Sequence, residues 1–386
     1  MIDLSRSTQS GATCEIEIYR SDGRRLMILD RAESFLATRV ISGVGEFIVS
    51  LPSDFPDYLM LPELNFWFWR KSKPGARKIL MFSGVSKSFE IGAPPNAKKV
   101  MSGVSFDWLF QSRALTFAQP GSYTMVGEAQ ATQLYENAGD RLLRTLDYPV
   151  NYPVGYPYEP PFLGMARRSI SYLPVSLYSP YRSAAPSESA LAWFVALRDE
   201  LETNGYSTFF EIIQTEPHSL EFRAYYKQPG RNLTIGNPGA LVLDSEIGNF
   251  ADGNYLEDYR TEANYLFAHQ TGSDSITPVI LNDSPYKEDR YASAPMAYTE
   301  AFVEQSLNSS LSGQAKTILF SRRGLRKLSG KIVNSAGCDY GLHWEFGDRI
   351  NVEHVGRLFE AIIKAVTFGI DAQGNEILEA AVEITL

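Results

Sequence analysis

The sequence predicts a mainly β protein of the α+β class, in which strands outnumber a few helices. Most apolar runs are short, and glycine, proline, asparagine or aspartate brackets each of them. β-Branched and aromatic residues, which favour strands, are frequent within these runs. Three longer stretches, at residues 128–146, 187–204 and 300–311, are predicted to be helical. The chain of 386 residues is long enough for about two to four domains with buried cores.

The first 115 residues are predicted to form one β unit. Apolar and polar residues alternate strictly over 14–19, and two further predicted strands, at 35–41 and 47–51, flank a glycine turn. Many short strands with glycine and proline turns are typical of a barrel or a sandwich. The unit closes near residue 113, where we expect Asp107 to cap a short helix.

The middle of the chain combines an extended segment with a mixed unit. Tyr-Pro pairs recur every four residues within 148–157, and five further prolines follow. Such a run disfavours helices and sheet ladders, so we expect an extended, partly polyproline segment. A docking arm for a partner and a long ordered excursion within one domain are equally good interpretations. Strands are predicted again at 208–213, 220–226 and 264–269.

The last 47 residues, 340–386, form a predicted β-meander, because turn residues separate three apolar runs. A short helix over 358–366 fits the apolar spacing nearly as well, but the closely spaced turns and β-branched residues favour strands. Gly347 and Asp348 are predicted to form a structural turn. The glycine supplies a positive φ, and the aspartate caps local backbone donors.

These patterns divide the chain into four units, which are not required to be continuous in sequence. We expect an N-terminal barrel-like domain at 1–115, a helix with the Tyr/Pro-rich insertion at 116–190, an α+β middle domain at 191–320, and the C-terminal meander at 321–386.

Charge and composition narrow the function classes. The net charge of -9 argues against a protein that binds nucleic acid by neutralising phosphate. The charge is uneven, however, because residues 66–99 carry eight basic residues and one acidic residue, whereas acidic residues cluster at 244–262. The two cysteines, Cys14 and Cys338, indicate a reducing compartment without a disulfide framework. No secretion signal or membrane span is visible, which predicts a soluble product made in a cytoplasm.

Four consecutive aromatic residues, Phe66, Trp67, Phe68 and Trp69, precede a basic stretch. Together they are able to stack bases and hold phosphates, as small barrels that bind single strands do. Consecutive residues of a strand point to opposite faces, however. We therefore expect two of the four rings in the core and two against a neighbouring subunit, and we take all four as candidate subunit-interface residues.

No catalytic, cofactor-binding or metal-binding residue is predicted. The four histidines are scattered, and no phosphate-binding loop, nucleophile elbow or dinucleotide fingerprint is present. The acidic pairs Glu257–Asp258 and Glu288–Asp289 are the best candidates for a glycosidase dyad. Adjacent carboxylates on a strand point to opposite faces, so we interpret both pairs as solvated or ion-paired surface groups.

The order of elements resembles the phage tail hub or baseplate hub family. The matching features are a glycine turn with an apolar strand at 45–52, a Phe-Ser-Gly-Val strand at 82–85, the segment from 107 to 113, the Asn-Tyr pair at 264–265, and the Gly-Asp strand start at 347–352. The sequence departs from that pattern at Ser105, where a glycine is expected, and at Thr299, which replaces the glycine of a Tyr-Gly pair.

The resemblance implies a structural, non-enzymatic hub without a cofactor, at the distal end of a virion tail and assembled in the host cytoplasm. In such a hub a homotrimer with two tube-like β-barrel domains per subunit surrounds a channel, residues 1–115 forming the first barrel and 321–386 completing the second. Smaller α/β domains are inserted between them. Its partners are the tail tube or distal tail proteins and the tip or fibre proteins, and DNA passes through the channel without specific binding.

The sequence leaves two other functions open. One is a tail-associated carbohydrate-active hydrolase. The other is a single-stranded nucleic-acid-binding protein that uses residues 66–78.

Overall fold

A computed structural model describes the chain in three long parts and several short ones. The long parts are 11–112 without 30, 74–75 and 93–97, then 207–258, and 325–384 without 334 and 336. The short parts are 2–4, 118–119, 122–125, 166–170, five residues at 191–198 with residue 189, then 265–270, 276–280 and 300–305. The predicted helix at 128–146 and the Tyr-Pro repeats at 148–157 lie outside the described residues.

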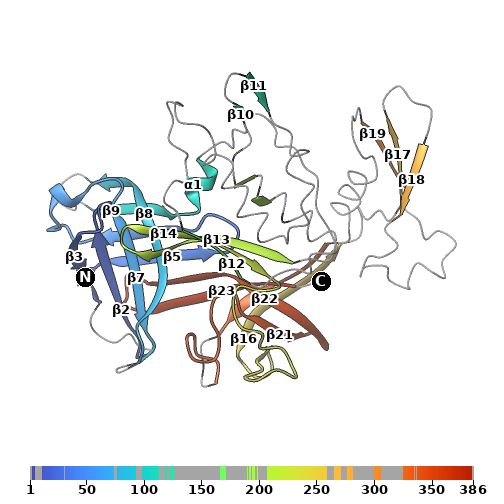
Figure 1. The fold of residues 1–386 in the computed structure, drawn as a ribbon. Helices are drawn as coiled ribbons and strands as arrows, with labels where there is room; N and C mark the ends of the chain where they lie inside the picture. The colour runs from blue at the N-terminus through green and yellow to red at the C-terminus, as the bar shows by residue number, and fades with distance from the viewer. Residues whose placement is uncertain are drawn as a thin grey trace.

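An 11-stranded sheet built mostly from the two ends of the chain dominates the described structure (Figure 1). Its order is β15-β21-β22-β5-β6-β9-β8-β7-β2-β3, and β23 pairs with β22. The strands are β2 (Thr13–Tyr19), β3 (Arg25–Leu29), β5 (Ser34–Val40), β6 (Glu46–Leu51), β7 (Asn65–Lys71), β8 (Ile79–Ile91), β9 (Lys99–Ser105), β15 (Val242–Asp244), β21 (Arg349–His354), β22 (Arg357–Ile370) and β23 (Glu376–Ile384). The mainly β character predicted from the sequence is confirmed.

The long strand β22 joins the two ends of the chain. Its first half pairs antiparallel with β21, and its second half pairs with β5 through the register Phe368↔Ala37. Strand β23 pairs along its other edge. Residues 358–366 are therefore strand rather than helix, as the turn pattern predicted. The same hydrogen bonds make the C-terminal meander a continuation of the N-terminal strands within one sheet.

Aromatic side chains show that this sheet curls around its core. Phe35 of β5 lies 5.7 Å from Phe68 of β7, between ring centroids, although three strands separate β5 from β7 in the sheet order. Phe68 also meets Phe368 of β22 at 6.0 Å and Phe47 of β6 at 5.2 Å. All four rings are buried. The described strands do not form a closed ring of hydrogen-bonded pairs, so barrel closure stays a prediction.

A buried ion pair ties the two sheet halves together. The Nε atom of Arg70 on β7 donates to Oε1 of Glu376 on β23 at 2.6 Å, and its Nη1 reaches the carbonyl of Tyr340 at 3.4 Å. Both charged side chains are buried. Breaking one partner of a buried pair costs about 3–5 kcal/mol, because the remaining charge loses its compensation.

A smaller sheet packs against the main one. It consists of β12 (Ala166–Ile170), β14 (Ser219–Tyr226) and β13 (Thr208–Glu216), with β13 and β14 forming an antiparallel hairpin. Phe210 and Phe222 of this hairpin pack with Phe110 and Phe194. Phe110 belongs to the short helix α1 (Trp108–Gln111), and residue 194 belongs to the region where residues 191, 192, 194, 195 and 198 are helical, within the predicted helix.

The remaining described elements lie outside the hydrogen-bonded order of the main sheet. They are β1 (Ile2–Asp3), β4 (Arg31–Ala32), η1 (Asp57–Leu59), β10 (Ala118–Gln119), β11 (Ser122–Met125), β16 (Phe250–Asp258), β17 (Tyr265–Gln270), β18 (Ile276–Ile280), β19 (Glu300–Gln305) and β20 (Leu325–Ile332). Phe250 of β16 and Leu328 and Ile332 of β20 nevertheless belong to the hydrophobic core of that sheet. The helix predicted at 300–311 is wrong for its first six residues. They form β19 instead, because parallel pairing with β17 outweighs the local preference.

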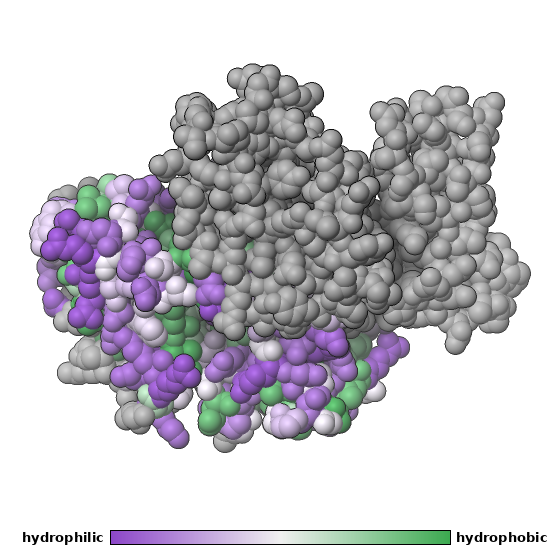
Figure 2. All heavy atoms as spheres, in the orientation of Figure 1, coloured by the Kyte–Doolittle hydropathy of each residue, from purple (hydrophilic) through white to green (hydrophobic). Residues whose placement is uncertain are grey.

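The visible surface of the described residues is mostly hydrophilic, with hydrophobic residues scattered among charged ones (Figure 2). No helix in the described part of the chain is both long and apolar enough to cross a membrane.

Candidate functional site

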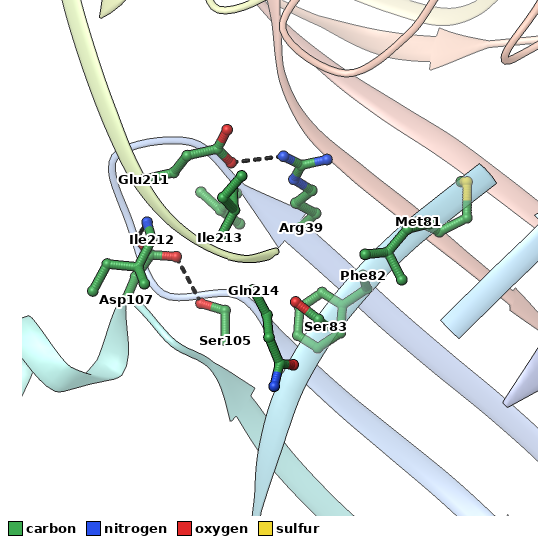
Figure 3. Close-up of a pocket in the computed structure, with 12 residues that line it drawn as sticks. Arg39, Met81, Phe82, Ser83, Ser105, Asp107, Glu211, Ile212, Ile213 and Gln214 are labelled. Atoms are coloured by element: carbon green, nitrogen blue, oxygen red, sulfur yellow. Dashed lines mark hydrogen bonds and ion pairs between the residues drawn. The ribbon is translucent and has the colours of Figure 1, made fainter. Parts of the chain in front are cut away.

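A pocket of about 200 Å³ lies where the β13 hairpin meets strands β5 and β8 of the main sheet (Figure 3). Six of its twelve lining residues are apolar, and the other six are polar or charged. The lining residues are Arg39, Val40, Leu80, Met81, Phe82, Ser83, Ser105, Asp107, Glu211, Ile212, Ile213 and Gln214.

An ion pair between sheet and hairpin forms one side of the pocket. Nη2 of Arg39, at the end of β5, donates to Oε2 of Glu211 on β13 at 2.7 Å. The hydroxyl of Tyr225 on β14 donates to the other oxygen of Glu211 at 2.6 Å. The guanidinium of Arg39 also lies 4.1 Å from the ring centre of Phe346. Burial opposes the charge of Arg39, but Glu211 raises the pKa of this guanidinium, which therefore stays charged.

Asp107 forms the other side of the pocket and is almost fully buried. One carboxyl oxygen accepts a hydrogen bond from the backbone N–H of Ile212 at 2.8 Å, and the other accepts from the hydroxyl of Ser105 at 3.0 Å. The Ser105 oxygen in turn accepts from the N–H of Gly45 at 3.0 Å. Asp107 therefore links the loop after β9 directly to the hairpin.

Burial raises the pKa of Asp107 to about 8, and the nearby negative charge of Glu211 adds to this effect. The hydrogen bonds from Ile212 and Ser105 and the positive charge of Arg39 act in the opposite direction. The folded protein thus keeps a proton on this carboxyl well above the pH at which an exposed aspartate loses it. An acid of this kind occurs at catalytic centres and in structural networks alike.

The contacts around Asp107 favour a structural role. Each of its two oxygens has a protein partner within hydrogen-bond distance, the backbone N–H of Ile212 and the hydroxyl of Ser105, and Arg39 is engaged by Glu211. The network holds the hairpin on the sheet through backbone and side-chain bonds that are shielded from water. Such shielded networks rigidify a joint when every member has a partner.

The sequence pointed to Asp107 but predicted the wrong role for it, that of a helix cap. Asp107 does precede α1, but its side chain makes no capping hydrogen bond and its φ and ψ are helical. Its carboxyl turns to Ile212 instead, a contact between residues 105 positions apart. Arg39 and Glu211 were missed. The placement of Glu211 inside the apolar run 208–213 is the feature that could have indicated a buried, paired charge.

The four aromatic residues of β7 divide between two faces of the sheet. Phe66 and Phe68 lie fully inside the core. Trp67, on the opposite face, is also buried, and its indole N–H donates to Gln214 of the hairpin in the same chain. Trp69 is half-buried. Contact of this strand with a neighbouring subunit stays a prediction, and Trp69 is the ring that is open to such a contact.

Trp69 belongs to a polar cluster around Glu17 on β2. Its indole N–H donates to Glu17 Oε2 at 2.7 Å, and the hydroxyl of Tyr19 donates to the same oxygen at 2.9 Å. Lys78 lies 4.5 Å from the Trp69 ring centre and 3.3 Å from the other oxygen of Glu17. Burial opposes ionisation, but these hydrogen bonds and the Lys78 charge together lower the pKa of Glu17.

Half of the eight basic residues at 66–99 form ion pairs within the described part of the chain. Arg70 pairs with Glu376, Lys78 with Glu15 and Glu17, and Lys99 with Asp57. Because Phe66, Trp67 and Phe68 are also buried, these rings cannot stack bases. The nucleic-acid-binding alternative therefore loses three of the four rings on which it rested.

The predicted turn at Gly347 and Asp348 lies at the start of β21. Gly347 has a φ of +82°. The buried carboxylate of Asp348 accepts from the backbone N–H groups of Glu345 at 2.8 Å and Arg231 at 2.6 Å. The Arg231 side chain adds an ion pair at 2.7 Å. The turn thereby anchors the segment before β15 to the C-terminal strands.

Glu257 and Asp258, the first acidic pair considered for hydrolysis, are neighbours on β16. Glu257 lies near the end of β16, where Arg357 donates to it at 3.0 Å and Tyr255 also donates to it. Glu288 and Asp289 lie outside the described residues. Within the described residues no three histidine, cysteine, aspartate or glutamate side chains are arranged to hold a metal ion.

Comparisons with known proteins identify the fold. No protein-family model matches the sequence. No curated protein matches it either. Among solved structures, the tail protein from Neisseria meningitidis MC58 superimposes with a TM-score of 0.53 at 9% identity, covering 97% of this chain and 96% of that one. The 43 kDa tail protein of prophage MuSo2 from Shewanella oneidensis gives a TM-score of 0.53 at 10% identity, covering 96% and 98%.

A third structure is prophage tail protein gp18 from Listeria monocytogenes EGD-e, with a TM-score of 0.52 at 11% identity and coverage of 96% and 94%. The three matches run along almost the whole of each chain. This chain therefore has the fold of phage tail proteins, as the order of its sequence elements predicted.

Proposed function

We propose that this chain is a structural hub of a phage or prophage tail. The observation that carries the proposal is the fold, which is shared over almost the full length with tail proteins from three bacteria. In the proposed assembly three copies form a ring. The ring joins a six-fold tail tube to a three-fold tip and surrounds the channel through which DNA leaves.

Two features of the described structure support assembly into a ring. Strands β3 and β23 pair on only one side within the described strands, which leaves strand edges that a closed ring of copies would cover. The second face of the curled sheet, where the smaller sheet does not cover it, is available for neighbours. The net charge of -9 suits a channel lining, because like charge disfavours contact with phosphate.

We further propose that the hub is not an enzyme. The buried acid Asp107 is engaged by backbone and hydroxyl donors, and Glu257 pairs with Arg357. The partners of the hub would be tail tube or distal tail proteins on one side and tip or fibre proteins on the other. The hub would take its place at the distal end of the tail after synthesis in the host cytoplasm.

The test is the mass and shape of the purified chain. The chain has a mass of 43.1 kDa, so a trimer corresponds to about 129 kDa by threefold multiplication. We expect light scattering to give this mass and negative-stain images to show a three-fold ring with an open centre. A compact monomer at every concentration, also after addition of isolated tail tubes, would contradict the proposed ring.

A further inference from the structure

One end of the main sheet presents exposed aliphatic side chains. Strands β15 and β21 run parallel with Asp244 opposite Glu353, so the turns that follow them lie at the same end of the sheet. Ile247 in the first turn is 70% exposed, and Val355 in the second is 77% exposed. Leu358, opposite Glu353 on β22, is 52% exposed. We call Ile247, Val355 and Leu358, with Glu246 and Glu353, the acidic tip.

The carboxylates of the acidic tip have no cationic partner in the described part of the chain. Glu246 and Glu353 are exposed and form no ion pair with any described residue. The surrounding sequence is acidic, because residues 207–258 carry eight acidic and three basic residues. Figure 2 shows hydrophobic and hydrophilic residues side by side along the lower edge, where Figure 1 places β16 and β21. An apolar surface rimmed by unpaired negative charge favours a partner surface with unpaired positive charge.

The backbone at the acidic tip carries strain that folding does not explain. Val355 has a φ of +54° and Gly356 has a φ of +68°, the combination of a two-residue hairpin turn. Asparagine or glycine suits the first of these positions, whereas a β-branched residue is a genuine outlier there. An exposed valine in this conformation lowers the stability of the turn and adds nothing to the core. Strain of this kind marks a site with another role, such as an apolar contact with a partner.

A surface of opposite charge lies at the turn between β7 and β8. Lys73 and Arg77 are exposed there and form no ion pair with described residues, in contrast to Lys78, which pairs with Glu15. Leu342, which is 61% exposed, belongs to a loop that packs on the start of β8. A Cβ atom built at its neighbour Gly341 would lie 2.2 Å from Cδ1 of Ile79. We call Lys73, Arg77 and Leu342 the basic turn.

The two surfaces lie on different sides of the molecule. In Figure 1, β7 and β8 lie on the left, and β16 and β21 lie near the middle of the lower edge. One copy can therefore offer its acidic tip to one neighbour and its basic turn to another. A head-to-tail contact between two different surfaces generates a closed ring when the rotation closes.

We infer that the acidic tip of one copy docks on the basic turn of the next copy. This inference rests on the proposed ring and names the two surfaces that close it. Val355 would contact Leu342 of the neighbour, while Glu246 and Glu353 would pair with Lys73 and Arg77. The occupant of the acidic tip is thus a second copy of this chain.

Charge reversal tests the inference in the full chain. One variant carries Glu246→Lys and Glu353→Lys, a second carries Lys73→Glu and Arg77→Glu, and a third carries all four changes. We expect each two-residue variant to weaken trimerisation at least about tenfold at low salt, because attraction becomes repulsion at two pairs. The four-residue variant restores opposite charges and should return the trimer dissociation constant to within about threefold of wild type. Sedimentation velocity measures all of them, with Glu46→Lys on the exposed face of β6 as the charge control.

Val355→Asn separates docking from folding. Asparagine tolerates the positive φ, so this variant should unfold at a higher urea concentration than wild type. If it nevertheless trimerises at least about threefold more weakly, the loss arises from the missing apolar contact rather than from misfolding.

The outcomes distinguish this inference from the proposed function. If wild type and all the variants form the ring with the same affinity, the proposed docking surfaces are wrong, but the proposed ring is not affected. Charge variants that form rings normally but fail to join tails would also overturn the docking between copies, because the acidic tip would then contact a different tail protein. A wild-type chain that never forms a ring would overturn both proposals.

Discussion

Replacing Asp107 by asparagine should change how the stability of the protein depends on pH. The carboxyl is buried between Ser105 and the backbone of Ile212, and its pKa is raised to about 8 from the ordinary 3.8, first by burial and then by Glu211. Asparagine has nearly the same shape. Its oxygen can accept from Ile212, and its amide can donate to the Ser105 oxygen once that hydroxyl rotates. The variant therefore keeps the network and loses only the titration.

The sign and size of the effect follow from proton linkage. Between pH 3.8 and about pH 8, Asp107 holds a proton in the folded protein that it releases in the unfolded chain. The stability that this proton provides is fully present below 3.8 and is lost as the pH rises through the folded pKa of about 8. Each pH unit in this window costs up to about 1.4 kcal/mol, so the whole window costs at most about 6 kcal/mol.

Urea unfolding of wild type and Asp107→Asn at a series of pH values measures this cost. Tryptophan fluorescence provides the signal, and the five tryptophans include Trp67, whose indole bonds to Gln214 of the hairpin. We expect the two proteins to be equally stable at about pH 5. By about pH 7.5, the free energy of unfolding of the variant should exceed that of wild type by up to about 3 kcal/mol. Glu211→Gln should reduce the dependence on pH, since it removes a negative charge that raises the Asp107 pKa.

The control is Glu46→Gln on β6, which removes an exposed carboxylate that water solvates in both states. Its stability relative to wild type should not rise with pH in the same way. A difference between Asp107→Asn and wild type that stays constant within about 0.5 kcal/mol across this pH range would refute the raised pKa and the shielded network.

Two further predictions concern the joints of the main sheet. Arg70→Met should destabilise the protein by about 3–5 kcal/mol by leaving Glu376 buried without a partner, whereas Arg70→Met with Glu376→Leu should recover most of the loss. A urea-based double-mutant cycle measures this, and an additive result would show that the pair is not coupled. Gly347→Ala should cost clearly more than Gly374→Ala: both glycines have φ above +80°, but only at 347 would the new Cβ lie 2.7 Å from Pro229. Thermal unfolding compares them, and equal losses would argue against the close packing at that turn.

The sequence by itself determined most of the local structure. Strict alternation over residues 14–19 and the apolar run at 208–213 predicted β2 and β13, because the two-residue period of a strand is written in consecutive side chains. The closely spaced turns of the C-terminal meander predicted strand rather than helix in β22. The order of these elements also indicated the fold of phage tail proteins, which the solved structures share.

Only the tertiary structure decided how distant segments meet. Residues 300–305 became strand because β17 offered a parallel partner, and no local pattern records that partner. The carboxyl of Asp107 turned from the helix beside it to the backbone of Ile212, and Trp67 was covered by Gln214. The last two contacts join residues more than 100 positions apart. The energy of each contact depends on how deeply it is buried and on which group of the distant segment forms the other partner. The residues around one partner determine neither of these.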